Sequence, residues 1–311
     1  MDISICTIVR LENKYIKEWV DYHLSIGFTH IYLYDNNRDG EESLSDVIDT
    51  DGKYHNSVTI IPFHHVSMYP QMYAYNDCWK QYQFDWMLFI DVDEFFTFGT
   101  DWIEAQNIHS FVRKYEKDWD AILLNWMCYG DNGHLHYSDF PLTKRFSKPL
   151  PLLLSASNMW GKQPINGHVK TFVRKGCDFQ FCNPHVGKGD YRVCNADGMS
   201  VKNEPWQPVQ TYRYAYLRHY YTKTIQEYVE HKVKRGLADR ASGKTYPLAD
   251  FFMCNKITFR KLYYYRKYKK SLGINGREKT FIWWLKMFLK HTLFCYLIDI
   301  KAYIKYAGFS Y

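Results

Sequence analysis

The stretch Trp86–Phe98, WMLFIDVDEFFTF, contains an unbroken apolar run that changes abruptly into a cluster of acids. Its first five residues, Trp86–Ile90, are all apolar, a pattern typical of a strand buried on both faces of a sheet. Three carboxylates follow within four residues, at Asp91, Asp93 and Glu94. Alternation along an extended chain would point Asp91 and Asp93 to the same side.

Carboxylates this close together repel each other and raise each other's pKa unless a cation lies between them. A hard divalent ion, bound by one or two carboxylates and by phosphate oxygens, would supply that cation. Mg²⁺ usually binds nucleotides in this way. The simpler interpretation is an acidic turn after a core strand. We favour the metal interpretation, because clustered acids at the end of a buried strand are costly unless they serve a role.

The residues around this stretch predict strands that alternate with helices. Strands are expected at 3–9, 30–34, 57–63, 86–90, 121–126 and 171–174, and helices at 72–81, 102–117 and 225–234. A further helix before Gly27 has one apolar face, formed by Ile16, Trp19, Val20, His23 and Leu24. His23 is therefore predicted to be a core histidine rather than a ligand. This alternation is typical of an α/β fold with a mostly parallel sheet and helices on its faces.

Ligands of such sheets bind beyond the carboxyl ends of the parallel strands. The first strand brings Arg10 and Glu12 to that edge, the second brings Asp35, and the fourth brings Asp91 and Asp93. The chain contains neither GxGxxG nor GxxxxGK[ST], the glycine-rich patterns that bind phosphates through backbone N–H groups. Binding of a diphosphate would therefore depend on a metal.

A second candidate for chemistry is the segment 129–134, YGDNGH, which offers an acid, Asp131, and an imidazole for proton transfer. Asp-Asn-Gly is also ordinary turn chemistry, and the two interpretations have equal weight.

Composition limits the choice of partners and compartment. The net charge of +7 favours anionic partners, and the 28 Tyr, 20 Phe and 10 Trp favour clefts in which rings stack on sugars or bases. Eight cysteines occur singly, and the first residues carry no secretory signal, so a cytoplasmic protein with reduced thiols is expected.

The composition changes beyond residue 240. Residues 260–270, RKLYYYRKYKK, hold six basic residues in eleven, and 281–306 mixes aromatic residues such as Trp283, Trp284, Phe288, Phe294 and Tyr296 with lysines. Segments of this kind suit the surface of a bilayer, here the inner face of the cell membrane. A helix packed on the domain with its lysines in water is nearly as well supported. We expect a catalytic domain at 1–240 and a basic, aromatic helical extension at 241–311.

Five blocks together resemble a known family, the metal-dependent glycosyltransferases of the GT-A fold, specifically family 92 and the related family 2-like group. The blocks are TIVRLENKYIKEWVDYHLSIGFTHIYLYDN at 7–36, WMLFIDVDEF at 86–95, NWMCYGDNGH at 125–134, HVKTFVR at 168–174 and RHYYTKTIQEYVEHKVKRG at 218–236. They occur in the expected order over three-quarters of the chain.

The resemblance implies a nucleotide-sugar donor, with a UDP-sugar expected, and inverting transfer to a glycan or lipid-linked acceptor in surface polysaccharide or lipopolysaccharide synthesis. It also implies Mn²⁺ or Mg²⁺ bound by Asp91 and Asp93, with His219 completing the metal site. Donor-binding roles fall on Arg10, Glu12, Asp35, Asp91, Lys170 and Lys223, and catalytic roles on Asp93 and Asp131. The family often has serine or another small residue where this chain has Asp131, so its role as a base is a departure from the family's pattern.

Two other functions are weighed against this one. A sugar-1-phosphate nucleotidyltransferase also combines an α/β sheet with a metal and a nucleotide, but it ordinarily carries a glycine-rich, basic loop that IVRLENKY lacks. A non-catalytic membrane or nucleic-acid binder would use 260–270 and would leave the acidic cluster unexplained. Nucleic acid is not expected as a partner, because those acids would repel its phosphates.

Overall fold

The computed structural model describes residues 1–64, 69–150, 165–236, 248–274, 285–286, 289–290 and 293 of the 311. The described residues form two compact units. Unit 1 contains 1–64, 69–127 and 166–219, and unit 2 contains 128–150, 165, 220–236 and the described residues from 248 onward. The boundary predicted at 240 lies outside the described residues.

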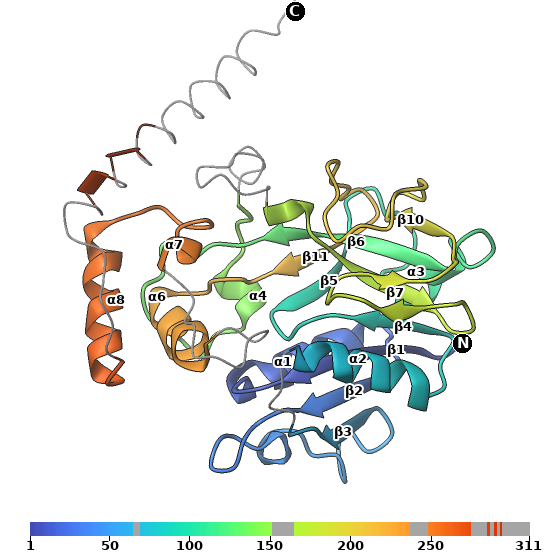
Figure 1. The fold of residues 1–311 in the computed structure, drawn as a ribbon, viewed down its shortest axis with the longest axis horizontal. Helices are drawn as coiled ribbons and strands as arrows, with labels where there is room; N and C mark the ends of the chain where they lie inside the picture. Colours follow the sequence, from blue (N-terminus) through green and yellow to red (C-terminus); the bar gives the residue numbers. More distant parts are fainter. Residues whose placement is uncertain are drawn as a thin grey trace, which may run out of the picture. The chain divides into compact units, whose positions relative to one another are not determined.

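Unit 1 is built on one large sheet with the strand order β3-β2-β1-β4-β7-β6-β11-β5, and β10 pairs with β6 (Figure 1). The strands are β1 Ile3–Val9, β2 His30–Asp35, β3 Val58–Pro62, β4 Trp86–Phe89, β5 Glu94–Phe98, β6 Ala121–Cys128, β7 Val169–Arg174, β10 Val193–Asn195 and β11 Ala215–His219. β8 Gln180–Phe181 and β9 Gly187–Lys188 form a separate hairpin. Strands β3, β2, β1 and β4 run parallel, whereas β7 is antiparallel to both of its neighbours and β5 to β11. The predicted α/β class with a mostly parallel central sheet is confirmed.

The helices of unit 1 are α1 Asn13–Ser25, α2 Pro70–Gln81 and α3 Ile108–Arg113, with a short 3-10 turn at Leu44–Asp46. Those of unit 2 are α4 Leu142–Arg145, α6 Ile225–Tyr228, α7 Leu248–Phe251 and α8 Phe259–Ser271. A π-helical turn, Val229–Val233, follows α6, and a 3-10 turn covers Ile165–Gly167. The helix predicted at 102–117 is much shorter, because the Asn107 side chain accepts a hydrogen bond from the His109 N–H and begins the helix there.

Helical segments cover both faces of the sheet, as two neighbouring residues of β7 illustrate. Successive side chains of a strand point to opposite faces. Val173 packs in the core cluster that contains Tyr75 of α2. Phe172 faces the other way, with its ring 6.5 Å from that of Phe111 on α3 and 6.1 Å from that of Phe28.

Helix α1 is tied to the backbone of β5 by three side chains. Trp19 Nε1 donates to the Glu94 carbonyl at 2.7 Å, and the Tyr22 hydroxyl donates to the Phe96 carbonyl at 2.6 Å. The Phe96 N–H donates in turn to His23 Nε2 at 3.2 Å. Because β5 begins at the last acid of the cluster, α1 determines where the acidic cluster lies.

His23 is a core histidine, as predicted. It is fully buried, and since Nε2 accepts a hydrogen bond, Nδ1 carries the proton and donates to the Trp19 carbonyl at 2.8 Å. Burial lowers the pKa of His23 to about 3.

Acid should therefore destabilise the protein through His23. Its pKa falls from the ordinary 6.5 to about 3 on folding, so between these values the unfolded chain binds the extra proton and the free energy of unfolding falls as pH falls. His23→Gln keeps an acceptor for the Phe96 N–H and does not titrate. Between about pH 7 and pH 5 the wild type should lose about 2 kcal/mol more than this variant, measured by urea unfolding.

His23→Leu is the matched control, because it leaves the buried Phe96 N–H without its acceptor and should cost about 1–3 kcal/mol at either pH. Parallel pH profiles for the wild type and His23→Gln would contradict the assignment.

Candidate active site

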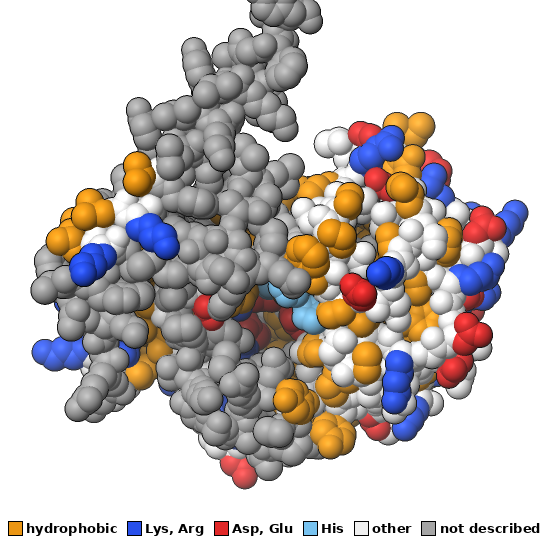
Figure 2. Space-filling model, turned by 45° about the horizontal axis from the view of Figure 1, so that its top comes forward, with side chains coloured by type: hydrophobic (Ala, Val, Ile, Leu, Met, Phe, Trp, Pro, Cys, Tyr) orange, Lys and Arg blue, Asp and Glu red, His pale blue; other side chains and the backbone are white. Residues whose placement is uncertain are grey.

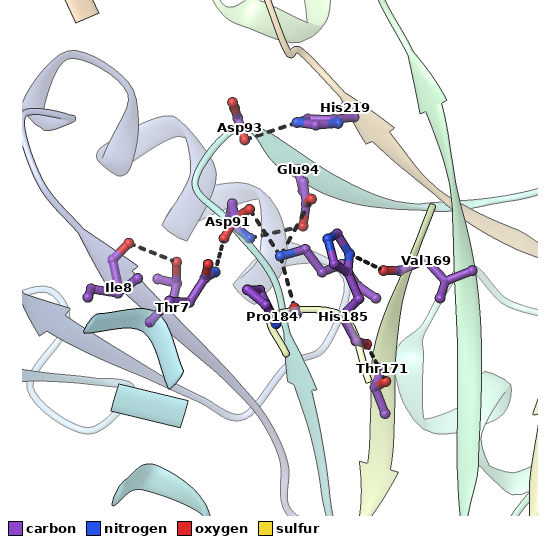
Figure 3. Close-up of polar contacts among 12 residues, drawn as sticks. Thr7, Ile8, Asp91, Asp93, Glu94, Val169, Thr171, Pro184, His185 and His219 are labelled. Atoms are coloured by element: carbon purple, nitrogen blue, oxygen red, sulfur yellow. Dashed lines mark hydrogen bonds and ion pairs between the residues drawn. The ribbon is translucent and has the colours of Figure 1, made fainter. Parts of the chain in front are cut away.

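The acidic cluster forms a tight turn between β4 and β5. The Glu94 N–H donates to the Asp91 carbonyl at 3.0 Å, and the Asp91 N–H donates to Glu94 Oε2 at 3.0 Å. The chain is not extended here, so the expected same-side alternation of Asp91 and Asp93 is wrong. Figure 3 shows the two carboxylates directed to different partners, with Asp93 facing His219.

Asp91 is held by side chains from two other elements of unit 1. Lys170 of β7 places Nζ 3.0 Å from Asp91 Oδ2, and Gln71 of α2 donates to Oδ1 at 2.5 Å. The Lys170 side chain is 1% exposed, and its Nζ also donates to the Pro184 carbonyl at 3.3 Å and lies 3.9 Å from Glu94 Oε1. The cation beside Asp91 is thus a lysine of the chain itself.

Burial and the neighbouring charges shift the pKa values of Lys170, Asp91 and Glu94 differently. Burial opposes the charge on Lys170, but Asp91 and Glu94 outweigh it and raise the pKa of Lys170. Loss of solvent works against the charge on Asp91, yet Lys170 holds the pKa of Asp91 below its usual value. Burial raises the pKa of Glu94 well above its usual value, although Lys170 acts in the opposite direction. Lys170 and Asp91 are therefore ionised, whereas Glu94 resists ionisation.

Asp93 and His219 form the second half of the site. His219 Nε2 lies 3.4 Å from Asp93 Oδ1, and both side chains are largely buried. His219 ends β11, where it pairs with Glu94 of β5, and its ring lies on Trp126 with the ring centroids 4.1 Å apart. On one face of the molecule acidic and histidine side chains gather in a hollow (Figure 2).

A divalent metal could use these residues only together with further ligands from outside the protein. No three His, Cys, Asp or Glu side chains in the described part of the chain are grouped closely enough to hold a metal ion by themselves. Mg²⁺ is ordinarily bound through one or two carboxylates together with substrate phosphates, and carboxylate and imidazole both suit Mn²⁺. The Asp93 carboxylate and the His219 imidazole, with Asp91 next to them in the turn, are donors of this kind.

The other predicted residues of unit 1 lie at the carboxyl ends of β1 and β2, as expected. Arg10 binds Glu41 through two parallel hydrogen bonds of 2.9 and 2.6 Å and lowers the pKa of Glu41 to about 2. Asp35 Oδ1 accepts from the Asn37 N–H at 3.0 Å. Glu12 is buried at the start of α1, where its carbonyl accepts the first N–H groups of the helix. Arg10 and Asp35 thus order the loop that follows β2.

Asp131 and Lys223 belong to unit 2. Asp131 is 4% exposed, Lys261 Nζ of α8 lies 2.5 Å from its Oδ2, and its N–H donates to Asn255 Oδ1 at 2.6 Å. Lys223 is buried in a left-handed conformation (φ 51°) beside the Thr224 cap of α6. Their predicted roles as catalytic base and donor-binding residue stay predictions.

Sequence reasoning missed Gln71 and Pro184. Gln71 had a signal, because it shares the buried face of α2 with Ala74, Tyr75 and Cys78, where a polar side chain needs a buried partner. Pro184 acts through its backbone carbonyl, for which a sequence carries no signal.

Known proteins resemble this chain in sequence. Residues 2–174, more than half of the chain, match the family model of glycosyltransferase family 92. A family 92 protein of Ricinus communis is 26% identical over 249 residues, which are 78% of this chain and 42% of that protein. One from Oryza sativa subsp. japonica is 27% identical over 113 residues, which are 36% of this chain and 18% of that protein. The chain thus spans about two-fifths of the length of the Ricinus relative.

Solved structures resemble it more distantly. S. aureus TarS has a TM-score of 0.37 at 14% identity and covers 87% of this chain and 44% of its own. The mannosyltransferase PcManGT from Pyrobaculum calidifontis, in complex with GDP-Man and Mn²⁺, has a TM-score of 0.30 at 11% identity, with 39% of this chain and 34% of its own covered.

The different ionisation of Lys170, Asp91 and Glu94 can be tested by measuring the free energy of unfolding of variants. Lys170→Met removes the buried counter-charge of Asp91 and should cost about 3–5 kcal/mol of unfolding free energy. Glu94→Gln mimics the protonated carboxyl and should cost less than about 1 kcal/mol. Because native Glu94 keeps a proton that the unfolded chain releases above its ordinary pKa of 4.5, wild-type stability should fall relative to Glu94→Gln as pH rises.

Urea unfolding of the wild type and both variants across the pH range measures these differences. A Glu94→Gln variant as damaged as Lys170→Met, or one whose stability follows the wild type at every pH, would mean that Glu94 is ionised in the folded protein.

Proposed function

Because the chain belongs to glycosyltransferase family 92, we propose that it transfers a sugar from a nucleotide-sugar donor to a hydroxyl group of a glycan or lipid-linked acceptor. The observation that carries the proposal is the acidic turn after β4, in which Asp91 is held by Lys170 and Gln71 while Asp93 faces His219. The turn lies within the residues that match the family, and it ends the strand next to β1.

The donor lies, in this proposal, along the carboxyl ends of β1, β2 and β4. The nucleoside portion, with UDP as the first candidate, lies near Arg10, Glu12 and Asp35, and the diphosphate lies at the acidic turn. Lys170 is buried and bonded to Asp91 Oδ2, so it acts through that carboxylate by fixing its position and charge. Lys223 stays a predicted donor ligand.

Asp91, Asp93 and His219 are the proposed ligands of Mn²⁺ or Mg²⁺. The ion, when bound, stabilises the negative charge that develops on the departing nucleoside diphosphate. The protein's own contribution is to hold the metal-binding side chains in place before the nucleotide binds. Gln71 and Lys170 fix Asp91, and Trp126 supports the His219 ring.

The reaction breaks the bond between the anomeric carbon and the phosphate oxygen. The acceptor oxygen forms its new bond on the opposite face of the sugar, which inverts the configuration, and its proton goes to a carboxylate base. Asp131 is the candidate named from the sequence, and this assignment stays a prediction. Synthesis of a surface polysaccharide or lipopolysaccharide is the proposed setting.

Removal of either Asp93 or His219, the proposed metal ligands that face each other, should abolish metal-dependent nucleotide binding. Asp93→Ala and His219→Ala should each weaken Mn²⁺-dependent binding of UDP, measured by calorimetry, by at least about tenfold and eliminate Mn²⁺-dependent release of UDP from UDP-sugars. GDP and dTDP, and the matching sugars, are tested in parallel. Asp101→Ala is the control, because Asp101 forms an exposed ion pair with Arg213.

Turnover that continues after the metal is chelated, or a His219→Ala variant that binds UDP with Mn²⁺ as the wild type does, would contradict the metal-centred proposal.

A membrane-facing role is proposed for α8. Its exposed side chains share one side of the helix, which carries cations and two rings: Phe259, Arg260, Tyr263, Arg266, Lys267 and Lys270. Lys261 faces inward to Asp131 and does not belong to this surface. The predicted anchors Trp283, Trp284, Phe288, Phe294 and Tyr296 lie outside the described residues. In the described part of the chain, no helix has the length and apolarity needed to cross a bilayer.

Anionic lipid should bind this face of α8. Each cation near a charged surface contributes on the order of 1 kcal/mol, so replacing Arg260, Arg266, Lys267 and Lys270 together by alanine should weaken co-sedimentation with phosphatidylserine vesicles by about a hundredfold or more. The control replaces four exposed cations of unit 1, Arg113, Lys114, Lys117 and Lys188, and changes the net charge equally.

Binding should also weaken with salt. Equal losses in both variants would mean that net charge alone matters, and no binding by the wild type at low salt would refute a membrane role for α8.

A further inference from the structure

A cavity of about 810 Å³ lies in unit 1 between α2 and the segment around β8. Its size falls within the range of about 300–1,000 Å³ typical of small-molecule sites. One wall is the less buried face of α2, with Met72, Tyr73, Asn76, Asp77 and Lys80 at three- and four-residue spacing. The other wall includes Phe181, Cys182, Asn183 and Pro184.

Tyrosine rings at the cavity offer stacking surfaces. Tyr69 and Tyr73 line it and are 49% and 55% exposed. A tyrosine combines an apolar ring face with a hydroxyl that forms hydrogen bonds, which matches the apolar C–H face and the hydroxyl rim of a sugar ring.

The polar groups of the cavity are fixed in place and balanced in charge. Asp77 accepts hydrogen bonds from the Tyr34 hydroxyl at 2.7 Å and from Gln81 at 2.6 Å, so its carboxylate is held rigidly. Asn183 Oδ1 accepts from the His185 N–H at 2.8 Å, which orients its amide. Lys80 offsets the charge of Asp77. The charge balance favours a neutral ligand rich in hydroxyls over a phosphate.

Both walls of the cavity are linked to residues that hold Asp91 of the acidic turn. Gln71, which donates to Asp91, is the residue of α2 directly before Met72 of the cavity wall. Pro184 lines the cavity, and its carbonyl accepts a hydrogen bond from Lys170 Nζ, the group that holds Asp91. The cavity is therefore connected, through the residues that hold Asp91, to the turn where the donor diphosphate is proposed to bind.

We infer that this cavity is a subsite for a neutral saccharide unit of the acceptor, with Tyr73 as its stacking residue. The inference rests on the proposed transferase function and names the acceptor's chemical class.

Cys182 provides a readout at the cavity itself. It is exposed, whereas Cys177 is less exposed and the other described cysteines are buried. The full chain is treated with N-ethylmaleimide, and alkylation of Cys182 is quantified by peptide mass spectrometry. The reaction is repeated with p-nitrophenyl glycosides of glucose, galactose and N-acetylglucosamine at about 10 mM. At least one glycoside should slow alkylation by up to about tenfold, as expected for a millimolar Kd, while Cys177, which does not line the cavity, is unaffected.

Tyr73→Ala should remove this protection and Tyr73→Phe should keep it, because phenylalanine retains the ring. Phe140→Ala, which removes an exposed aromatic side chain of unit 2, should also keep it. The inference is overturned if no glycoside protects Cys182, if UDP with Mn²⁺ protects it instead, or if Tyr73→Ala is protected like the wild type.

Mn²⁺-dependent hydrolysis of UDP-, GDP- and dTDP-sugars by the wild type without acceptor reports on the proposed function separately. Protection of Cys182 without hydrolysis of any nucleotide sugar would contradict the transferase proposal and leave a saccharide site. Hydrolysis without protection of Cys182 would contradict only the proposed subsite.

Discussion

A single buried ammonium group, Lys170 Nζ, allows this chain to place three carboxylates within four residues at the end of a core strand. Carboxylates cannot be removed from water at such density without compensation, because each needs a counter-charge or a proton. Lys170 compensates Asp91 directly, and burial raises the pKa of Glu94, which reduces its negative charge beside the other two acids. Asp93 is then left to face His219. The chemistry proposed for the site depends on this division of charge.

The position of the acidic turn depends on contacts far from it in sequence. Trp19, Tyr22 and His23 of α1 form hydrogen bonds with the backbone of β5, and β5 starts at the end of the turn. These bonds use the ring edges of residues whose ring faces pack in the core. A helix that a hydropathy pattern describes only as amphipathic therefore also sets the alignment of the site, as precise ligand binding requires.

Several charged groups that a sequence offers to a ligand are used by the protein to order itself. Arg10 binds Glu41 in the loop after β2, and in unit 2 Lys261 of the basic helix binds Asp131. Ion pairs of this kind, when buried, are costly to break, because the partner left behind has no compensation. By contrast, Arg260 and Lys270 of α8 are exposed, as are the Tyr69 and Tyr73 rings at the cavity beside α2.

The sequence by itself determined the elements whose signal is local. Apolar runs predicted β1, β2, β4 and β6, apolar spacing predicted α1, and the alternation of strands with helices brought Arg10, Asp35 and Asp91 to one edge of the sheet. Only the tertiary structure decided that β5 pairs with β11, that the acidic cluster turns, and that the cation at Asp91 is Lys170, 79 residues away. The reason is physical. The pattern of apolar and polar residues indicates which side of each segment is buried, whereas strand order and register decide which buried charges face each other.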